Sequence, residues 1–415
     1  MTVSKKSNVL LPQYMQQFQC IGSECEDTCC AGWAVTIDKA TYRKYRNCRD
    51  NELQDSFQKN LTRNRNNPTD ATYAKMKLKE DLSCPFLNHQ KLCSIQLRLG
   101  EDHLSHTCRT YPRAYNLIDG VIEKSATMSC PEAARLALLN PNKMEFTHIE
   151  EAIERKDIHG RIFDTNHPQL SKRIEKYFWD LRIFTIQILQ SREYKLWERL
   201  IILGMFYQTI QEYLEQGKLE EIPEYIAEYT TGIEHGIFDD TLNNIPSNEM
   251  VQINLLLEVL SNKKQFGGFG QRFLNRYNEF RQGIHADEHP SISRVIENYV
   301  IAYERYYAPF IEHHEYILEN YLVNYVFMYM FPLYKTNNLF ENYVLMVAHY
   351  SLIKMFLIGM SGYHKEEFST AHVVSLISSM AKNIEHSDKF LTRTVEYFKE
   401  NGYATLSHMM LLIKN

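Results

Sequence analysis

The chain has 415 residues, of which 44% are hydrophobic and 23% are charged, and its formal net charge is −5. This composition is typical of a globular protein, and the acidic balance argues against nucleic acid as a partner. A chain of this length usually exceeds one hydrophobic core, so we expect two domains. Residues 1–10 contain lysines but no apolar stretch of the kind that a secretory signal needs, which predicts a cytoplasmic protein.

The N-terminal part alternates short strand and helix signals. Residues 34–37 alternate between apolar and polar positions, and Asp38 is a good N-cap, so we expect a short strand followed by a helix over 39–47. Residues 57–70 are polar and basic with one proline, which predicts a mobile linker.

A hairpin and a helix are expected next. The dipeptide Asp119-Gly120 separates the runs 113–118 and 121–127, which predicts a β-hairpin with a tight turn. The stretch Ser129-Cys130-Pro131 marks a helix start, where the helix dipole favours a thiolate.

From about residue 147 onward, apolar residues recur with the period of a helix. The fold class we expect is α+β, with a small cysteine-rich domain of short strands and helices (1–146) followed by a large all-α domain (147–415). The apolar stretches 321–334 and 343–360 are interrupted by polar residues and a proline, so they predict buried core helices. A membrane span needs about twenty mostly apolar residues; peripheral membrane contact stays open.

Tyrosine is abundant, with 27 residues in the chain and dense runs at 303–307 and 316–329. Such rings usually pack between helices with their hydroxyls at the surface. The alternative is a pocket for a cation, because tyrosine faces attract ammonium and methylated ammonium groups.

All nine cysteines lie in the first 130 residues, and four of them form the run Cys20-x4-Cys25-x3-Cys29-Cys30. Disulfides would need an oxidising compartment, and ordinary buried thiols would be scattered along the whole chain. We therefore interpret the cysteines as ligands of a soft metal. Cys48 stands alone and is interpreted as a thiol at a helix end.

The spacing bears on which metal is bound. Zinc sites commonly use Cys-x2-Cys pairs, and this sequence has none. Gaps of four, three and zero residues favour a loop around an iron–sulfur cluster, and zinc is the alternative. His103 and His106, shortly before Cys108, are either additional nitrogen ligands or structural histidines.

The cysteine pattern also resembles that of a known family. The segments that carry the resemblance are Cys20-x4-Cys25-x3-Cys29-Cys30-Ala31-Gly32-Trp33, Cys84-Pro85-Phe86-Leu87, Leu92-Cys93, Cys108-Arg109-x-Tyr111-Pro112-Arg113, Ser129-Cys130-Pro131-Glu132-Ala133-Ala134-Arg135 and Trp197–Gly204. Together they closely resemble the flagellin lysine-N-methylase family. The resemblance implies N-methylation of flagellin surface lysines in the bacterial cytosol, with S-adenosylmethionine and an iron–sulfur cluster, expected to be of the 4Fe–4S type, as cofactors.

The resemblance places the cluster ligands among eight cysteines: Cys20, Cys25, Cys29, Cys30, Cys84, Cys93, Cys108 and Cys130. Eight thiolates exceed the four that one cluster takes. Either two centres exist or some of these cysteines are structural. The adjacent pair Cys29-Cys30 also departs from the Cys-x3-Cys-x2-Cys pattern of radical S-adenosylmethionine enzymes.

Two mechanisms are open at this stage. In polar transfer, a desolvated aromatic pocket aligns the lysine, a Tyr or Glu takes its proton, and the cluster is structural. In a redox mechanism the cluster binds the cofactor and delivers an electron. Arg109 and Arg113 are candidates for binding the cofactor carboxylate. The competing class is a non-enzymatic metal-binding adaptor, with zinc or iron–sulfur as a staple and a helical domain that docks a partner.

Overall fold

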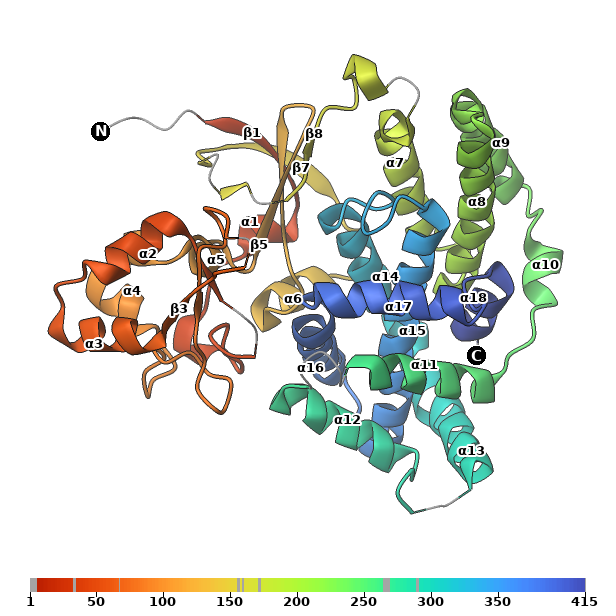
Figure 1. Ribbon diagram of the computed structural model, residues 1–415. Helices are drawn as coiled ribbons and strands as arrows, with labels where there is room; N and C mark the ends of the chain where they lie inside the picture. The colour runs from red at the N-terminus through yellow and green to blue at the C-terminus, as the bar shows by residue number, and fades with distance from the viewer. Residues whose placement is uncertain are drawn as a thin grey trace.

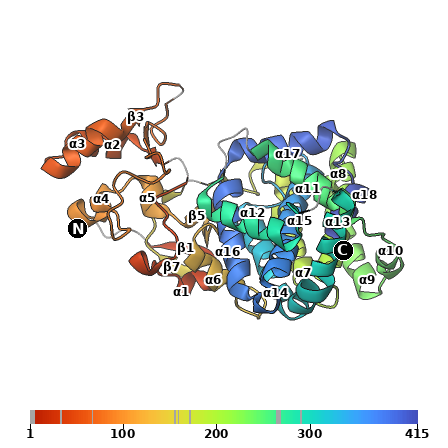
Figure 2. The same ribbon diagram turned by 90° about the horizontal axis from the view of Figure 1, so that it is seen from below.

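The computed structural model describes residues 6–32, 35–66, 68–154, 157–158, 160–170, 173–263, 269–288 and 291–414. A small cysteine-rich unit lies apart from a large helical body, and a twisted sheet lies where the two meet (Figure 1). The same separation is visible after a quarter turn (Figure 2).

The strands are β1 (Ser7–Pro12), β2 (Thr36–Ile37), β3 (Leu61–Arg63), β4 (Ala74–Met76), β5 (Arg113–Ile118), β6 (Val121–Ala126), β7 (Phe146–Glu151) and β8 (Ile162–Phe163). The shorter helices of the N-terminal part are α1 (Tyr14–Gln17), α2 (Lys39–Arg46), α3 (Asn51–Asn60), α4 (Ser94–Leu99), α5 (His106–Thr110) and α6 (Pro131–Leu138). The helices of the body are α7 (Phe178–Leu189), α8 (Leu196–Gln216), α9 (Ile222–Glu234), α10 (Asp239–Asn243), α11 (Glu249–Lys263), α12 (Gln271–Gly283), α13 (Ile292–Ala302), α14 (Ala308–Met328), α15 (Leu339–His364), α16 (Thr370–Met380), α17 (Asp388–Glu400) and α18 (Leu406–Ile413).

The larger sheet has the strand order β7-β1-β6-β5-β8. Strands β5 and β6 form the predicted hairpin, with Ile118 paired to Val121 across the turn. Asp119 and Gly120 both have positive φ, at 51° and 78°. A two-residue hairpin turn of this type requires left-handed backbone at both positions, which explains the Asp-Gly signal. The hairpin prediction is confirmed.

The cysteine-rich unit has its own small core, built around Val35, Ile37, Tyr45 and Phe57. Helix α2 begins after Asp38, whose carboxylate accepts a hydrogen bond from the Thr41 N–H at 2.8 Å. The N-cap and the helix are therefore confirmed, and the strand prediction is confirmed over Thr36–Ile37. Ala34 lies outside the described residues, as does Trp33 of the family pattern.

The predicted linker over 57–70 is wrong in its first half. Helix α3 continues to Asn60, and β3 then pairs with β4. The reason is Phe57, which is buried and stacks on the Tyr45 ring at a centroid distance of 4.1 Å. One anchored aromatic ring holds this polar stretch in regular structure. Asn67 lies outside the described residues.

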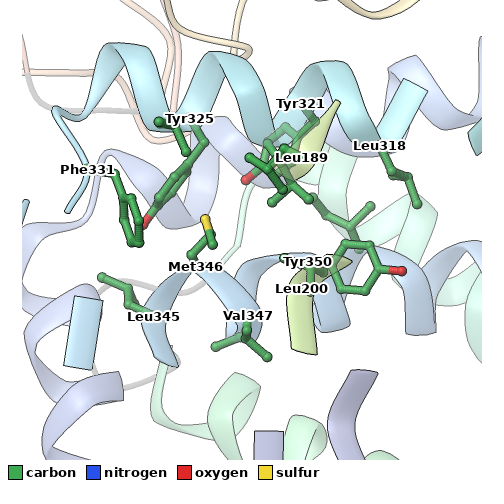
Figure 3. Close-up of a cluster of buried hydrophobic side chains, with 14 of the residues drawn as sticks. Leu189, Leu200, Leu318, Tyr321, Tyr325, Phe331, Leu345, Met346, Val347 and Tyr350 are labelled. Atoms are coloured by element: carbon green, nitrogen blue, oxygen red, sulfur yellow. The ribbon is translucent and has the colours of Figure 1, made fainter. Parts of the chain in front are cut away.

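The helical body surrounds α14 and α15, so the two apolar stretches belong to core helices as predicted, except that α14 ends at Met328 and not near residue 334. Pro332 lacks the N–H that a helix needs and disfavours helical backbone at the residue before it. Figure 3 shows Leu318 and Tyr321 of α14 facing Met346 and Tyr350 of α15. Among the described residues, one helical segment, Leu339–Glu367, is long and apolar enough to cross a membrane, and its apolar window is entirely buried in the protein. Burial of this kind is what a core helix shows.

The boundary expected at 146/147 does not coincide with the division between the cores. Strands β7 and β8 lie beyond residue 146, and the helices of the body begin only at Phe178. Strand β7 is an edge strand that pairs with β1 alone and is half exposed, so its apolar alternation is weak in the sequence. The larger sheet shares the core of the helical body. Gly270 is the N-cap residue of α12.

Candidate functional site

Five cysteine side chains line one cavity of about 70 Å³ in the cysteine-rich unit. They are Cys29, Cys30, Cys84, Cys93 and Cys108. The Sγ atoms of Cys29 and Cys30 are 3.9 Å apart. The nine cysteines, all of which belong to the described residues, form no disulfide with one another. The structure thus brings together five of the eight cysteines that were expected to hold a cluster.

Local hydrogen bonds hold these cysteines in place. The Cys84 N–H donates to the Cys30 carbonyl at 2.7 Å, which joins the two loops. Cys93 is the N-cap residue of α4. The Cys108 N–H donates to Ser105 Oγ at 3.2 Å, at the start of α5. The Asp38 carboxylate, which caps α2, also accepts a hydrogen bond from the His106 N–H at 3.2 Å. One side chain therefore holds the first turns of α2 and α5 together.

The environment of the thiols favours their neutral form. Burial raises the pKa of Cys108 to about 12 and raises the pKa of Cys84 and Cys93. The hydrogen bond with Cys30, together with burial, raises the pKa of Cys29. A bound metal reverses this balance, because a coordinating thiol is deprotonated outright.

The remaining predicted ligands form a second group. The Cys130 thiol interacts electrostatically with Cys25 and Cys20, and burial raises its pKa to about 11. Cys130 is the N-cap residue of α6, at the helix start that the sequence predicts. Cys48 follows α2, as expected of a helix-end thiol, and it does not line the cavity.

The thiols are the donor type of both candidate groups, a zinc ion and an iron–sulfur cluster. Over the residues that the structure describes, no three His, Cys, Asp or Glu side chains stand close enough to hold one metal ion. A zinc ion needs four ligands at about 2.0–2.3 Å. Here five thiols line the walls of one cavity, and cysteine thiolates are also the ligands of iron–sulfur clusters.

A second and much larger cavity, of about 710 Å³, adjoins the first. Its walls come from α5, β5, the end of α14 and the turn before α17; they include Thr110, Tyr111, Arg113, Tyr115, Asn116, Met328, Tyr329, Tyr334, Glu385 and His386. A volume of this size is in the range of small-molecule sites, roughly 300–1,000 Å³. The cavity therefore has room for a cofactor and a substrate side chain.

Tyr111 lines both cavities. Its hydroxyl is 3.0 Å from Ser129 Oγ, and His386 Nε2 is 2.8 Å from the same oxygen. Burial lowers the pKa of His386 to about 4. A hydrogen-bonded chain thus runs from the wall of the thiol cavity to the helical body.

A salt-bridge network ties the cysteine loop to the helical body. Lys382 Nζ donates to the Thr28 carbonyl at 2.7 Å and lies 3.1 Å from the Asp27 carboxylate. Arg272 Nη1 lies 3.2 Å from the same carboxylate. Burial alone would raise the pKa of Asp27, but these two charges lower it. The loop that carries Cys25 and Cys29 is therefore attached to the helices.

The two predicted cofactor-binding arginines have different surroundings. Arg113 lines the large cavity, and its guanidinium lies 5.2 Å from the centre of the Phe18 ring. Arg109 instead forms a salt bridge with Asp157 and does not line the cavity. The two predicted histidines also separate. His106 lines the large cavity, with Nδ1 3.5 Å from Asp157, and His103 lies in the turn after α4.

Sequence reasoning named no catalytic residue, and it missed Glu385. This carboxylate accepts hydrogen bonds from Tyr321 Oη at 2.7 Å and from Tyr329 Oη at 2.8 Å. Glu385 is one of 51 acidic residues, and no spacing in the sequence distinguishes it. It ends a π-helical turn, Ala381–Glu385, a type of turn that is rare and frequent at functional sites.

Comparisons with known proteins agree with this architecture. Residues 182–412 match the family model described as the FliB lysine N-methylase C-terminal domain. The chain is 28% identical over 258 residues to the lysine-N-methylases of Salmonella typhimurium and Salmonella choleraesuis, which covers 61% of this chain and of each relative. It is 33% identical over 160 residues to the flagellar biosynthetic protein FliU of Salmonella muenchen, covering 38% of this chain and 93% of that protein. No solved structure matches.

Fold and site define an α+β protein in which a thiol-lined N-terminal unit borders a large cavity on a helical body. The chain belongs to the FliB lysine N-methylase C-terminal domain family, whose model covers more than half of it, from α7 to α18. It spans 61% of the length of the two lysine-N-methylases that it matches. All nine cysteines precede residue 182, where the match to the family model begins.

Proposed function

We propose that this protein is a protein-lysine N-methyltransferase that uses S-adenosylmethionine and acts on flagellin in the bacterial cytosol. Membership of the family supports the reaction class, and the names of the relatives support a flagellar substrate. The observation that carries the proposal is the common wall of the two cavities, where Tyr111 separates five thiols from a space of about 710 Å³.

The large cavity suits methyl transfer physically. The lysine nitrogen must lose its proton and point at the sulfonium methyl, so the protein has to align two partners and exclude water. Arg113 lines this cavity and offers a guanidinium to the cofactor carboxylate. Tyr329 and Tyr334, which follow the end of α14, provide an aromatic wall. These residues hold and orient the partners whichever transfer mechanism operates.

We propose that Cys29, Cys30, Cys84, Cys93 and Cys108 supply the ligands of an iron–sulfur cluster of 4Fe–4S type. When bound, such a cluster supplies a structural cross-link in polar transfer or an electron in a redox mechanism. The group of Cys20, Cys25 and Cys130 is then structural or belongs to a second centre. Zinc is the alternative metal.

The first test is metal and acid-labile sulfide analysis of protein purified without oxygen. We expect iron with matching sulfide in the wild type and in Cys48→Ser, the matched control outside the cavity. Cys108→Ser should lose most of both, because its thiol is one of the five that line the cavity. Zinc without sulfide would refute the iron–sulfur cluster and leave polar transfer as the enzymatic scheme.

The second test is transfer of a labelled methyl group from S-adenosylmethionine to purified flagellin, with modified lysines located by mass spectrometry. The release of S-adenosylhomocysteine without 5′-deoxyadenosine would identify polar transfer, and deoxyadenosine would identify a radical route. No methylation and no saturable cofactor binding by metal-replete, reduced protein would reject the enzyme in favour of a metal-binding adaptor.

A further inference from the structure

Glu385 is a buried carboxylate on the wall of the large cavity. Its side chain is 9% exposed, and its two oxygens each accept one tyrosine hydroxyl, from Tyr321 and Tyr329. Burial raises the pKa of Glu385, and these two hydrogen bonds offset part of the effect. A carboxylate in such a place is costly unless a positive charge accompanies it.

The part of the chain that the structure describes supplies no such charge. Glu385 has no salt bridge there, and the cations around the cavity have other partners. Arg113 stacks on Phe18, Arg161 donates to the Tyr334 carbonyl at 2.5 Å, Lys335 pairs with Asp388, and Lys382 pairs with Asp27. The missing counter-charge can come from a ligand in the cavity.

Aromatic faces lie next to this carboxylate. Tyr329 and Tyr334 both line the cavity, and their ring centroids are 4.5 Å apart. Tyr325 backs Tyr329 at 4.8 Å, and Figure 3 shows it directed toward Phe331 on the core side. Tyrosine faces attract ammonium and methylated ammonium groups. A carboxylate beside two such rings is the combination that recognises an alkylammonium group.

We propose that Glu385, Tyr329 and Tyr334 form the site that receives the side-chain nitrogen of the substrate lysine. The site deepens the proposed function and rests on it for the identity of the substrate. The carboxylate supplies the charge, and the two rings supply a surface that also accepts a methylated nitrogen. The position of Glu385, on the same cavity as Arg113, places amine and cofactor in one space.

The test uses n-butylammonium, a mimic of the lysine side chain, and ligand-observed NMR on the full chain. We expect Glu385→Gln to weaken binding at least about tenfold, which equals about 1.4 kcal/mol. Glu341→Gln is the matched control, since Glu341 pairs with Lys399 away from the cavity and should bind like the wild type. n-Pentanol, which lacks the charge, should not distinguish the variants.

A second pair of variants tests the rings without touching the carboxylate. Tyr334→Phe keeps the aromatic face and should bind n-butylammonium like the wild type, whereas Tyr334→Leu should bind severalfold more weakly. Circular dichroism verifies the fold of each variant. Equal binding by the wild type, Glu385→Gln and Tyr334→Leu would overturn the inference.

Methylation assays separate this inference from the proposed function. If both hold, Glu385→Gln raises the KM for flagellin while the affinity for S-adenosylmethionine stays the same. If the wild-type protein methylates flagellin but Glu385→Gln binds the amine equally well, the proposed amine site is overturned and the proposed function stands. Glu385-dependent amine binding in a protein that transfers no methyl group would reject the proposed function and support the amine site.

Discussion

The buried pair Arg182–Glu123 holds the larger sheet to the helical body. Glu123 is on β6 and Arg182 on α7, and their side chains are 1% and 2% exposed. The guanidinium makes two hydrogen bonds to the carboxylate, one of them at 2.9 Å. It also lies 4.5–5.1 Å from the ring centres of Phe178, Trp179 and Phe327. Truncation of either partner leaves the other as a buried, unpaired charge.

The cost of Glu123→Met or Arg182→Met follows from this burial. Breaking a fully buried pair costs about 3–5 kcal/mol, whereas replacing both partners with apolar residues is often neutral. A large domain loses about 2 °C in melting temperature per kcal/mol, so each single variant should melt about 6–10 °C lower. The double variant Glu123→Met/Arg182→Met should recover most of this loss.

The assay is thermal melting by circular dichroism, with urea unfolding to close the double-mutant cycle. Arg294→Met, which removes the partner of Glu297 in a pair exposed on both sides, is the control and should shift the transition little, because exposed pairs contribute about 0–1 kcal/mol. The reasoning would be refuted if the single variants cost less than about 1 kcal/mol, or if the double variant cost the sum of the singles.

Three further outcomes follow from the structure. Gly283→Ala should destabilise the protein by about 1–3 kcal/mol in urea unfolding, because the new Cβ would stand 1.8 Å from the Gly359 carbonyl oxygen. This clash outweighs the gain in helix propensity, which is at most about 1 kcal/mol. Burial lowers the pKa of Lys354 to about 7. Between pH 7 and 10 the unfolded chain therefore binds more protons at this residue than the folded chain does. The stability of the wild type relative to Lys354→Met should rise over this range by up to about 1.4 kcal/mol per pH unit. Because burial raises the pKa of Glu385, Glu385→Gln should melt above the wild type at pH 7, and the difference should vanish as the pH falls to about 4.

Local chemistry made part of the fold predictable. The Asp119-Gly120 turn, the Asp38 cap and the helix start at Cys130 each depend on residues within a few positions. The two apolar core helices were predictable because their burial is nearly complete. Where a short polar segment depends on one distant contact, as residues 57–63 do through Phe57, the sequence pattern predicted the wrong structure.

The sequence predicted which thiols belong to the site but not how they are arranged. The sequence identified the thiols, yet their division into a group of five around a cavity and a second group near α6 depends on the packing of loops. The large cavity could not be predicted, because its walls come from segments more than 200 residues apart, such as Tyr111 and Glu385. A tyrosine run predicts rings between helices, and only the fold determines which rings face a space.

One π-helical turn joins the two halves of this site. Lys382 and Glu385 are three residues apart in it, which is less than one turn of a π-helix. Lys382 contacts the loop that carries Cys29, through Asp27 and Thr28. Glu385 contacts Tyr321 and Tyr329, and Tyr329 lines the large cavity. A change in the cysteine loop is therefore only one helical turn away from the proposed amine site. This short connection gives a physical reason for the cysteine loop to influence the proposed amine site, whether or not the proposed cluster takes part in the chemistry.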